Sequence, residues 1–224
     1  MILRTLFFLF IIRPISTFVL GMNVRNYIRL PKKGPVIVIA NHNSHLDTVV
    51  LMSLFPLKSL SKIHPVAAAD YFLANPILAW FSTKIIGIIP FKRTVGRENP
   101  FAEIEKALDQ NEIIIFFPEG SRGEAEKLSP MKSGIAHLAK KFPHVPIIPV
   151  FLHGLGKALP KGDPILVPFM VDVAIGEPIP FSQDKASFME SIAQAFEELS
   201  HFDKVGNVKD EPKGSENGNF QAQG

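Results

Sequence analysis

Apolar residues follow two different spacings along the chain, and segments of the two kinds alternate. Short apolar runs rich in β-branched residues predict buried strands at residues 35–40, 63–69, 85–91, 112–117, 145–152 and 169–175. Helical spacing and helix-start signals predict helices at residues 46–54, 70–83, 100–110, 133–142 and 182–199. Such alternation predicts an α/β fold with a largely parallel central sheet flanked by helices.

The N-terminal residues are apolar but interrupted. An apolar run from Thr5 to Ile12 ends at Arg13-Pro14, after which residues 14–24 are again mostly apolar. An arginine in the middle of a bilayer costs about 2.5 kcal/mol or more, and proline starts a new helix readily. We therefore predict two short helices in one leaflet of a membrane, with Arg13 reaching the lipid phosphates. A single tilted span and a core helix of a soluble domain remain alternatives.

These patterns divide the chain into three parts. Residues 1–30 form the N-terminal membrane-associating helical segment, and residues 31–202 form one α/β domain. Residues 203–224 are polar and rich in Gly and Asn, with few apolar side chains to offset the entropy of ordering. We expect this tail to be disordered.

Composition supports contact with lipid. Hydrophobic residues make up 46% of the chain, which is high for a soluble enzyme and low for a protein with many spans. The net charge of +3 gives no indication of nucleic-acid binding. Basic residues beside the apolar N-terminus favour anionic head groups, although a solvated loop explains them equally well: Arg13, Arg25, Arg29, Lys32 and Lys33. The absence of cysteine excludes disulfides, thiolate nucleophiles and cysteine-ligated metals.

The first candidate site runs from Asn41 to Asp47, between a predicted strand and a predicted helix. His42 has the ordinary pKa that suits a general base near neutral pH. A carboxylate at Asp47 would fix its tautomer and stabilise the imidazolium, and the nucleophile would be the hydroxyl of the substrate. Alternatively, Asn41 or Ser44 caps a helix, and His45 is a competing candidate for the base.

The second candidate site runs from Phe117 to Gly123, after the most apolar predicted strand. Ligands of parallel α/β sheets bind at the carboxyl ends of strands. Arg122 offers a planar set of donors suited to phosphate, and Gly120 lets the backbone approach an anion closely. Glu119 would orient the arginine or bind a substrate hydroxyl, or the two charges would form only a salt bridge that stabilises the turn.

Two further stretches follow predicted strands. Residues 87–93 end in Lys92 and Arg93, which add positive charge, although a solvated basic turn would look the same. Residues 145–150 carry no titratable group and are expected to shape an apolar wall.

Taken in order, these four blocks resemble the lysophosphatidate and glycerol-3-phosphate acyltransferase family. The family is marked by Asn-His-x-x-x-x-Asp, Gly-x-x-x-Phe-x-Arg, Phe-Pro-Glu-Gly-[Ser/Thr]-Arg and Val-Pro-x-x-Pro-Val blocks, and the resemblance covers about residues 34–180. The first and third blocks are specific, whereas the second and fourth are weak. Asn43, Lys92 and Gly123 depart from the residues frequent in the family and leave the acceptor open.

The resemblance implies an acyltransferase that moves a fatty acyl group from acyl-CoA or acyl carrier protein to the hydroxyl of a lysophosphatidate-type lipid in phospholipid biosynthesis. His42 would be the general base and Asp47 its orienting acid. The implied phosphate-binding residues are Arg93, Glu119, Gly120, Ser121 and Arg122. No metal or prosthetic group is implied, nor is nucleic acid. We expect a protein associated with membrane lipid, on the cytoplasmic face.

Other functions remain possible from the sequence. The acceptor could be glycerol 3-phosphate or another lysolipid, and a protein that binds lipid without turnover would need the same apolar groove. A thioester hydrolase would use water as the acceptor. Arg93 and Arg122 argue against hydrolysis, because water needs no phosphate-binding residues.

Overall fold

One mixed, mostly parallel sheet forms the centre of the protein. The computed structural model describes residues 2–72, 74–92, 99–124, 127–159, 165–181 and 184–201. Within these residues the strands lie in the order β1-β7-β6-β2-β5-β3-β4. Their bounds are β1 Asn23–Arg25, β2 Val36–Ala40, β3 Ile63–Ala68, β4 Ile89–Phe91, β5 Ile113–Phe116, β6 Ile147–His153 and β7 Asp172–Ile175. Neighbouring strands are parallel except β6 and β7, so the predicted α/β class is confirmed.

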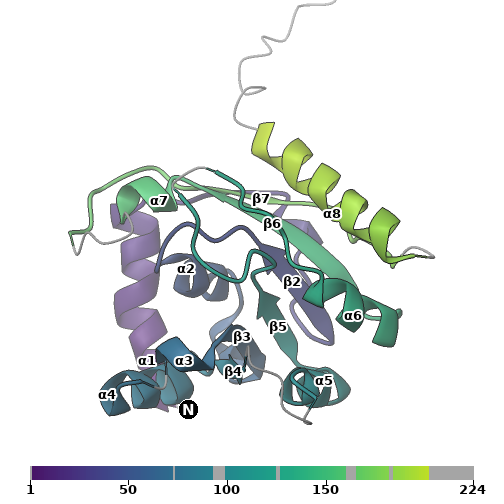
Figure 1. Ribbon diagram of the computed structural model, residues 1–224. Helices are drawn as coiled ribbons and strands as arrows, with labels where there is room; N and C mark the ends of the chain where they lie inside the picture. Colours follow the sequence, from purple (N-terminus) through teal and green to yellow (C-terminus); the bar gives the residue numbers. More distant parts are fainter. Residues whose placement is uncertain are drawn as a thin grey trace, which may run out of the picture.

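Helices cover both faces of the sheet (Figure 1). On one face lie α5 (Ala102–Asp109), α6 (Gly134–Lys141) and α8 (Lys185–Ser200), and on the other lie α1 (Ile2–Phe7), α2 (Asp47–Ser53) and α7 (Leu155–Ala158). Strand β2 contributes to both cores in alternation: Val36, Val38 and Ala40 pack on the α2 side, and Ile37 and Ile39 on the α5 side. Burial on both faces explains why this strand has no polar residue.

The remaining short helices lie between these elements. They are η3 (Tyr27–Arg29), η4 (Leu57–Lys62), α3 (Ala69–Phe72), α4 (Pro76–Trp80) and η5 (Phe81–Ile86). The sequence analysis did not predict η3, η4, α7 or the edge strand β1, all of which are short. Strand β1 lies within the segment 1–30 that was expected to associate with membrane. The tail predicted to be disordered, 203–224, lies outside the described residues.

The prediction of one helix over residues 70–83 is wrong. Asn75 is extended, and its side-chain oxygen accepts hydrogen bonds from the backbone N–H groups of Ile77 and Leu78, so a new helix begins at Pro76. That helix continues through η5 and ends at Gly87, whose φ of +75° suits glycine. Strand β4 consequently begins at Ile89, later than the predicted 85–91.

The predicted break at Arg13-Pro14 is also wrong. Residues Ile2–Val19 form one continuous helix, which is long and apolar enough to cross a membrane by length and composition. Pro14 has helical dihedral angles, and π-helical turns at Phe8–Ile12 and Ile15–Val19 lie on either side of it. The wider π turns, with bonds between residues five apart, accommodate a proline that would strain a regular α-helix.

The widened turns also keep one face of this helix against the domain. Its buried residues recur every four positions: Arg4, Phe8, Ile12 and Ser16. In a regular α-helix such a stripe would rotate by about 40° with each repeat. The π turns add residues per turn and so hold the stripe on one side.

Both arginines of the helix turn inward. Arg13 donates a hydrogen bond to the carbonyl of Phe55 at 3.0 Å, in place of the lipid phosphates that we predicted. Arg4 donates to the carbonyl of Ile63 at 2.8 Å. Backbone carbonyls of the domain therefore accept a hydrogen bond from each guanidinium group, and the outward face of the helix carries no charge.

Candidate active site

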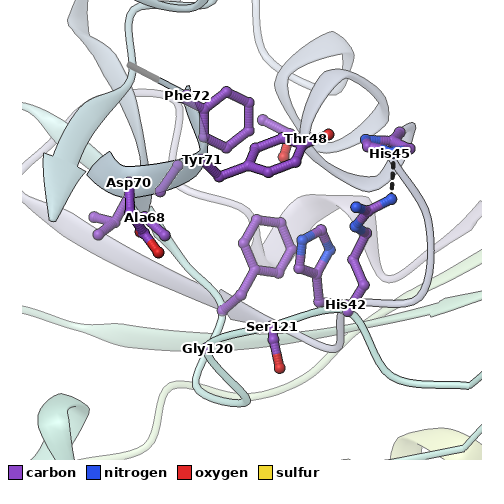
Figure 2. Close-up of a pocket in the computed structure, with 13 residues that line it drawn as sticks. His42, His45, Thr48, Ala68, Asp70, Tyr71, Phe72, Gly120 and Ser121 are labelled. Carbon is purple, nitrogen blue, oxygen red and sulfur yellow. Dashed lines mark hydrogen bonds between the residues drawn. The ribbon is translucent and has the colours of Figure 1, made fainter. Parts of the chain in front are cut away.

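The candidate site is a cleft at the carboxyl ends of three neighbouring strands. In the sheet, β5 lies between β2 and β3, and all three run parallel. The segments that follow β2, β5 and β3 therefore emerge side by side. They enclose a cleft of about 300 Å³ (Figure 2). Its polar and aromatic lining residues include His42, His45, Thr48, Asp70, Tyr71, Phe117, Ser121 and Arg122.

His42 is held by a buried carboxylate. Its Nδ1 lies 2.9 Å from Oδ2 of Asp47, which is 1% exposed. The same oxygen accepts the backbone N–H groups of Asn43 at 2.7 Å and Ser44 at 2.8 Å. A carboxylate oxygen accepts only, so Nδ1 of His42 carries the proton and the lone pair of the neutral ring is on Nε2. The ring also stacks on Phe117, with centroids 4.2 Å apart.

Asn41 anchors the turn to the sheet rather than capping a helix. Its side-chain amide donates to the carbonyl of Leu152 and accepts from the N–H of the same residue, at 2.8 and 2.7 Å. The amide thus imitates a backbone peptide and extends the pairing of β2 with β6 by one step. Ser44 lies in the same turn, and its hydroxyl donates to the carbonyl of Leu159 at 3.1 Å. Both polar residues fix the position of His42.

The turn after β5 brings Arg122 to the cleft. Gly120 has a φ of +72°, which lets the chain reverse tightly. A residue with a Cβ atom would be strained in this conformation. The guanidinium of Arg122 contacts Nε2 of His45 and lies 5.9 Å from the ring centre of Tyr71 (Figure 2). A cation from this turn therefore stands beside the histidine turn, at the same cleft.

Glu119 is buried and links the turn after β2 to the turn after β5. Its side chain is 3% exposed. One carboxylate oxygen accepts the backbone N–H of His42 at 2.7 Å, and the other accepts the N–H of Ser129 at 3.0 Å. The N–H of Gly123 in turn donates to the carbonyl of His42 at 2.9 Å. The backbone of His42 is therefore bonded on both sides to the Phe117–Gly123 segment.

Comparison with known proteins agrees with this geometry. Residues 21–153, more than half of the chain, match the protein family described as Acyltransferase. A chloroplastic 1-acyl-sn-glycerol-3-phosphate acyltransferase of Brassica napus is 30% identical over 65% of this chain and 41% of its own length. The 1-acyl-sn-glycerol-3-phosphate acyltransferase alpha of Homo sapiens is 28% identical over 58% of this chain and 45% of its own.

The chain belongs to the Acyltransferase family. It spans less than half the length of these two relatives. Its fold is that of the 1-acyl-sn-glycerophosphate acyltransferase PlsC from Thermotoga maritima, with a TM-score of 0.62 at 23% identity over 88% of this chain and 95% of that one. The predicted resemblance to lysophosphatidate acyltransferases is confirmed.

In this member of the family most of the expected site residues come together. His42, Gly120, Ser121 and Arg122 line the cleft, and Asp47 lies behind His42. Glu119 is placed differently from our expectation: both of its oxygens bind backbone N–H groups, and it is absent from the lining of the cleft. Arg93 lies outside the described residues. The roles of these residues in catalysis and phosphate binding stay predictions.

Two features of the cleft were not predicted from the sequence. His45 was considered only as a competing base, yet it contacts Arg122. Tyr71 was not considered, because its place beside the cleft depends on α3 starting immediately after β3. The presence of two histidines within one polar turn was the sequence signal that could have indicated a role for His45. Among the described residues, no group of three His, Asp or Glu could hold a metal ion.

We expect the substitution Glu119→Gln to destabilise the protein. An amide has one accepting oxygen, so its NH₂ group would face a backbone N–H, of His42 or of Ser129. Leaving such a buried donor without a partner costs about 1–3 kcal/mol. Urea unfolding of the purified protein would measure the difference.

Glu124→Gln is the matched control, because Glu124 is exposed and its partner is the side chain of Lys127. It should change the free energy of unfolding by less than about 0.5 kcal/mol. Equal stability of the two variants would show that Glu119 does not hold the turns together.

Proposed function

We propose that this protein transfers a fatty acyl group from a thioester, either acyl-CoA or acyl carrier protein, to the hydroxyl of a lysophosphatidate-type lipid. The observation that carries the proposal is the 2.9 Å contact between His42 and Asp47 at the edge of a cleft that also holds Arg122. A base oriented by a carboxylate and a cation suited to phosphate are what this reaction requires.

The chemistry follows from the tautomer of His42. The acceptor hydroxyl gives its proton to Nε2 of His42 as its oxygen attacks the thioester carbonyl, and Asp47 stabilises the imidazolium that forms. The carbon–sulfur bond then breaks, and the thiolate takes the proton back from Nε2. An ester and a free thiol result. The acceptor hydroxyl is itself the nucleophile, so no serine or cysteine of the chain is needed.

The acceptor is inferred from the positive charge in the cleft. Arg122 presents guanidinium donors beside His42, in the arrangement that suits a phosphate group on the lipid that is to be acylated. The names of the relatives, which specify 1-acyl-sn-glycerol-3-phosphate, support a lysophosphatidate acceptor. Glycerol 3-phosphate and other lysolipids carry the same phosphate chemistry and are the alternative acceptors.

Two other functions use fewer of these features. A thioester hydrolase needs the His42–Asp47 pair but leaves Arg122 without a role, because water carries no phosphate. A protein that binds lipid without turnover leaves the orientation of His42 without a role. Acyl transfer accounts for all three residues.

We further propose that the N-terminal helix binds the membrane from the cytoplasmic side, by lying in its surface. Arg4 and Arg13 both point into the domain, so the outward face is uncharged. Its most exposed apolar side chains include Ile2, Leu3, Phe10, Ile11 and Phe18. Phe7 packs edge-on against Phe81 of η5 at 5.4 Å, which places α4 with its exposed Ile77 and Trp80 next to the same face. A lipid surface would cover both helices.

Replacement of the proposed base should abolish transfer. We expect His42→Ala to lower kcat by about 10²–10⁴-fold, the usual contribution of general-base catalysis. The assay incubates purified protein with radiolabelled acyl-CoA or acyl carrier protein and a panel of lysolipids. Labelled lipid indicates transfer, free fatty acid indicates hydrolysis, and neither indicates binding alone.

The control is His144→Ala, at an exposed position away from the cleft. It should retain the activity of the unmodified protein. Normal transfer by His42→Ala would exclude His42 as the base.

The exposed helix face should determine membrane affinity. Phe10 and Phe18 are 68% and 84% exposed, so Phe10→Glu with Phe18→Glu should leave folding unchanged. Each phenylalanine contributes about 1.5 kcal/mol or more when buried in lipid. Sedimentation with phospholipid vesicles should therefore show affinity reduced by about tenfold or more. Gln194→Glu on α8 adds a charge elsewhere and should not change it; unchanged binding of the double variant would contradict the proposal.

A further inference from the structure

His45 is a second histidine of the cleft, and it is placed to do something other than catalyse. It lies three residues after His42 on the same turn, and its Nε2 contacts the guanidinium of Arg122 (Figure 2). A guanidinium can only donate hydrogen bonds. Nε2 of His45 therefore carries a lone pair, and the ring is neutral with its proton on Nδ1.

The position that His45 occupies is one that an anion would occupy. The donors of an arginine are suited to phosphate or carboxylate oxygens, which accept more strongly than a neutral imidazole. In the structure the imidazole of His45 takes one of these donors. Entry of a phosphate at Arg122 would displace this contact and leave the imidazole next to the anion.

The surroundings of His45 favour its neutral form. Burial lowers the pKa of His45, the positive charge of Arg122 and the protonated form of His42 lower it further, and Asp47 acts in the opposite direction. A phosphate dianion bound between Arg122 and His45 would reverse the sign of the nearest charge and favour the imidazolium. From the facing helix α3, Asp70 and the phenol of Tyr71 also line the cleft.

We propose that His45 is a second phosphate-binding residue of the acceptor site, which accepts a hydrogen bond from Arg122 in the structure and donates one to the acceptor phosphate as an imidazolium. The proton that His45 gains on binding comes from solvent. This inference rests on the proposed function, because it assumes an acceptor that carries phosphate. It makes His45 a determinant of acceptor affinity, and leaves the proton transfer at the hydroxyl to His42.

The substitution His45→Gln separates this role from a structural one. The glutamine oxygen can accept from Arg122 as Nε2 does, but the amide does not become a cation. At pH 6.5 we expect His45→Gln to raise the KM for lysophosphatidate by about tenfold or more, the effect of a lost charge-assisted hydrogen bond. The kcat should change by less than about threefold. The KM ratio between variant and unmodified protein should fall towards one as the pH rises to 8.5, because His45 is then neutral in the complex too.

The second ionisation of the phosphate itself affects both proteins equally and cancels in the KM ratio. One control variant and one control acceptor isolate the effect of His45. His144→Gln, at an exposed position outside the cleft, should leave KM unchanged at every pH. With monoacylglycerol, an acceptor of similar shape that lacks phosphate, His45→Gln should have little effect on whatever transfer occurs.

A binding measurement tests the inference independently of turnover. Calorimetric titration of lysophosphatidate in buffers of different ionisation enthalpy reports the protons taken up on binding. Near pH 7.5 the unmodified protein should take up more protons per bound lipid than His45→Gln does. Equal proton uptake and a KM ratio independent of pH would overturn the inference. A loss of kcat in His45→Gln with every acceptor would also overturn it, because His45 would then belong to the chemistry. Absence of any acyl transfer by the unmodified protein would refute the proposed function separately.

Discussion

The carboxylate of Asp47 is the feature on which the rest of the site depends. One of its oxygens accepts three hydrogen bonds, from the ring of His42 and from the backbone N–H groups of Asn43 and Ser44. The two backbone bonds close the turn, and the ring bond selects the tautomer of His42. Because both effects come from a single buried oxygen, the shape of the turn and the tautomer of His42 cannot vary independently. In the proposed reaction, a base held in this way would already be aligned before substrate arrives.

The parallel sheet supplies the second condition, which is proximity. Residues 41–47 and 117–123 are far apart in sequence, but β2 and β5 are neighbours and end at the same edge. Glu119 then fixes the distance between its own turn and the His42 turn, because its carboxylate accepts the backbone N–H of His42. Its other oxygen accepts the backbone N–H of Ser129. The glutamate of the Phe-Pro-Glu-Gly-Ser-Arg block thus holds the backbone of His42, whereas the arginine three residues later lines the cleft. The two charged side chains of this short block therefore have different surroundings.

Much of this could be predicted from the sequence, since the signals were local. Burial of β2 and β5 on both faces gives unbroken apolar runs, and the fold class follows from their alternation with helices. The outcomes that differed depend on contacts between distant residues. Pro14 lies inside a helix because π turns widen it against the domain, and Arg13 finds its partner in Phe55. Likewise, two histidines in one polar turn mark His45 as a candidate, but the local sequence does not pair it with Arg122 or turn Glu119 inward.

The central claim is that Asp47 fixes His42 with the proton on Nδ1 and the lone pair on Nε2. Nitrogen-15 NMR of histidine-labelled protein, with His42 assigned by comparison with His42→Ala, tests it directly at a pH where the ring is neutral. We predict a protonated Nδ1 and an unprotonated Nε2 for His42, with this preference lost in Asp47→Ala. A ring protonated at Nε2, or a tautomer that does not respond to the loss of the carboxylate, would contradict the account.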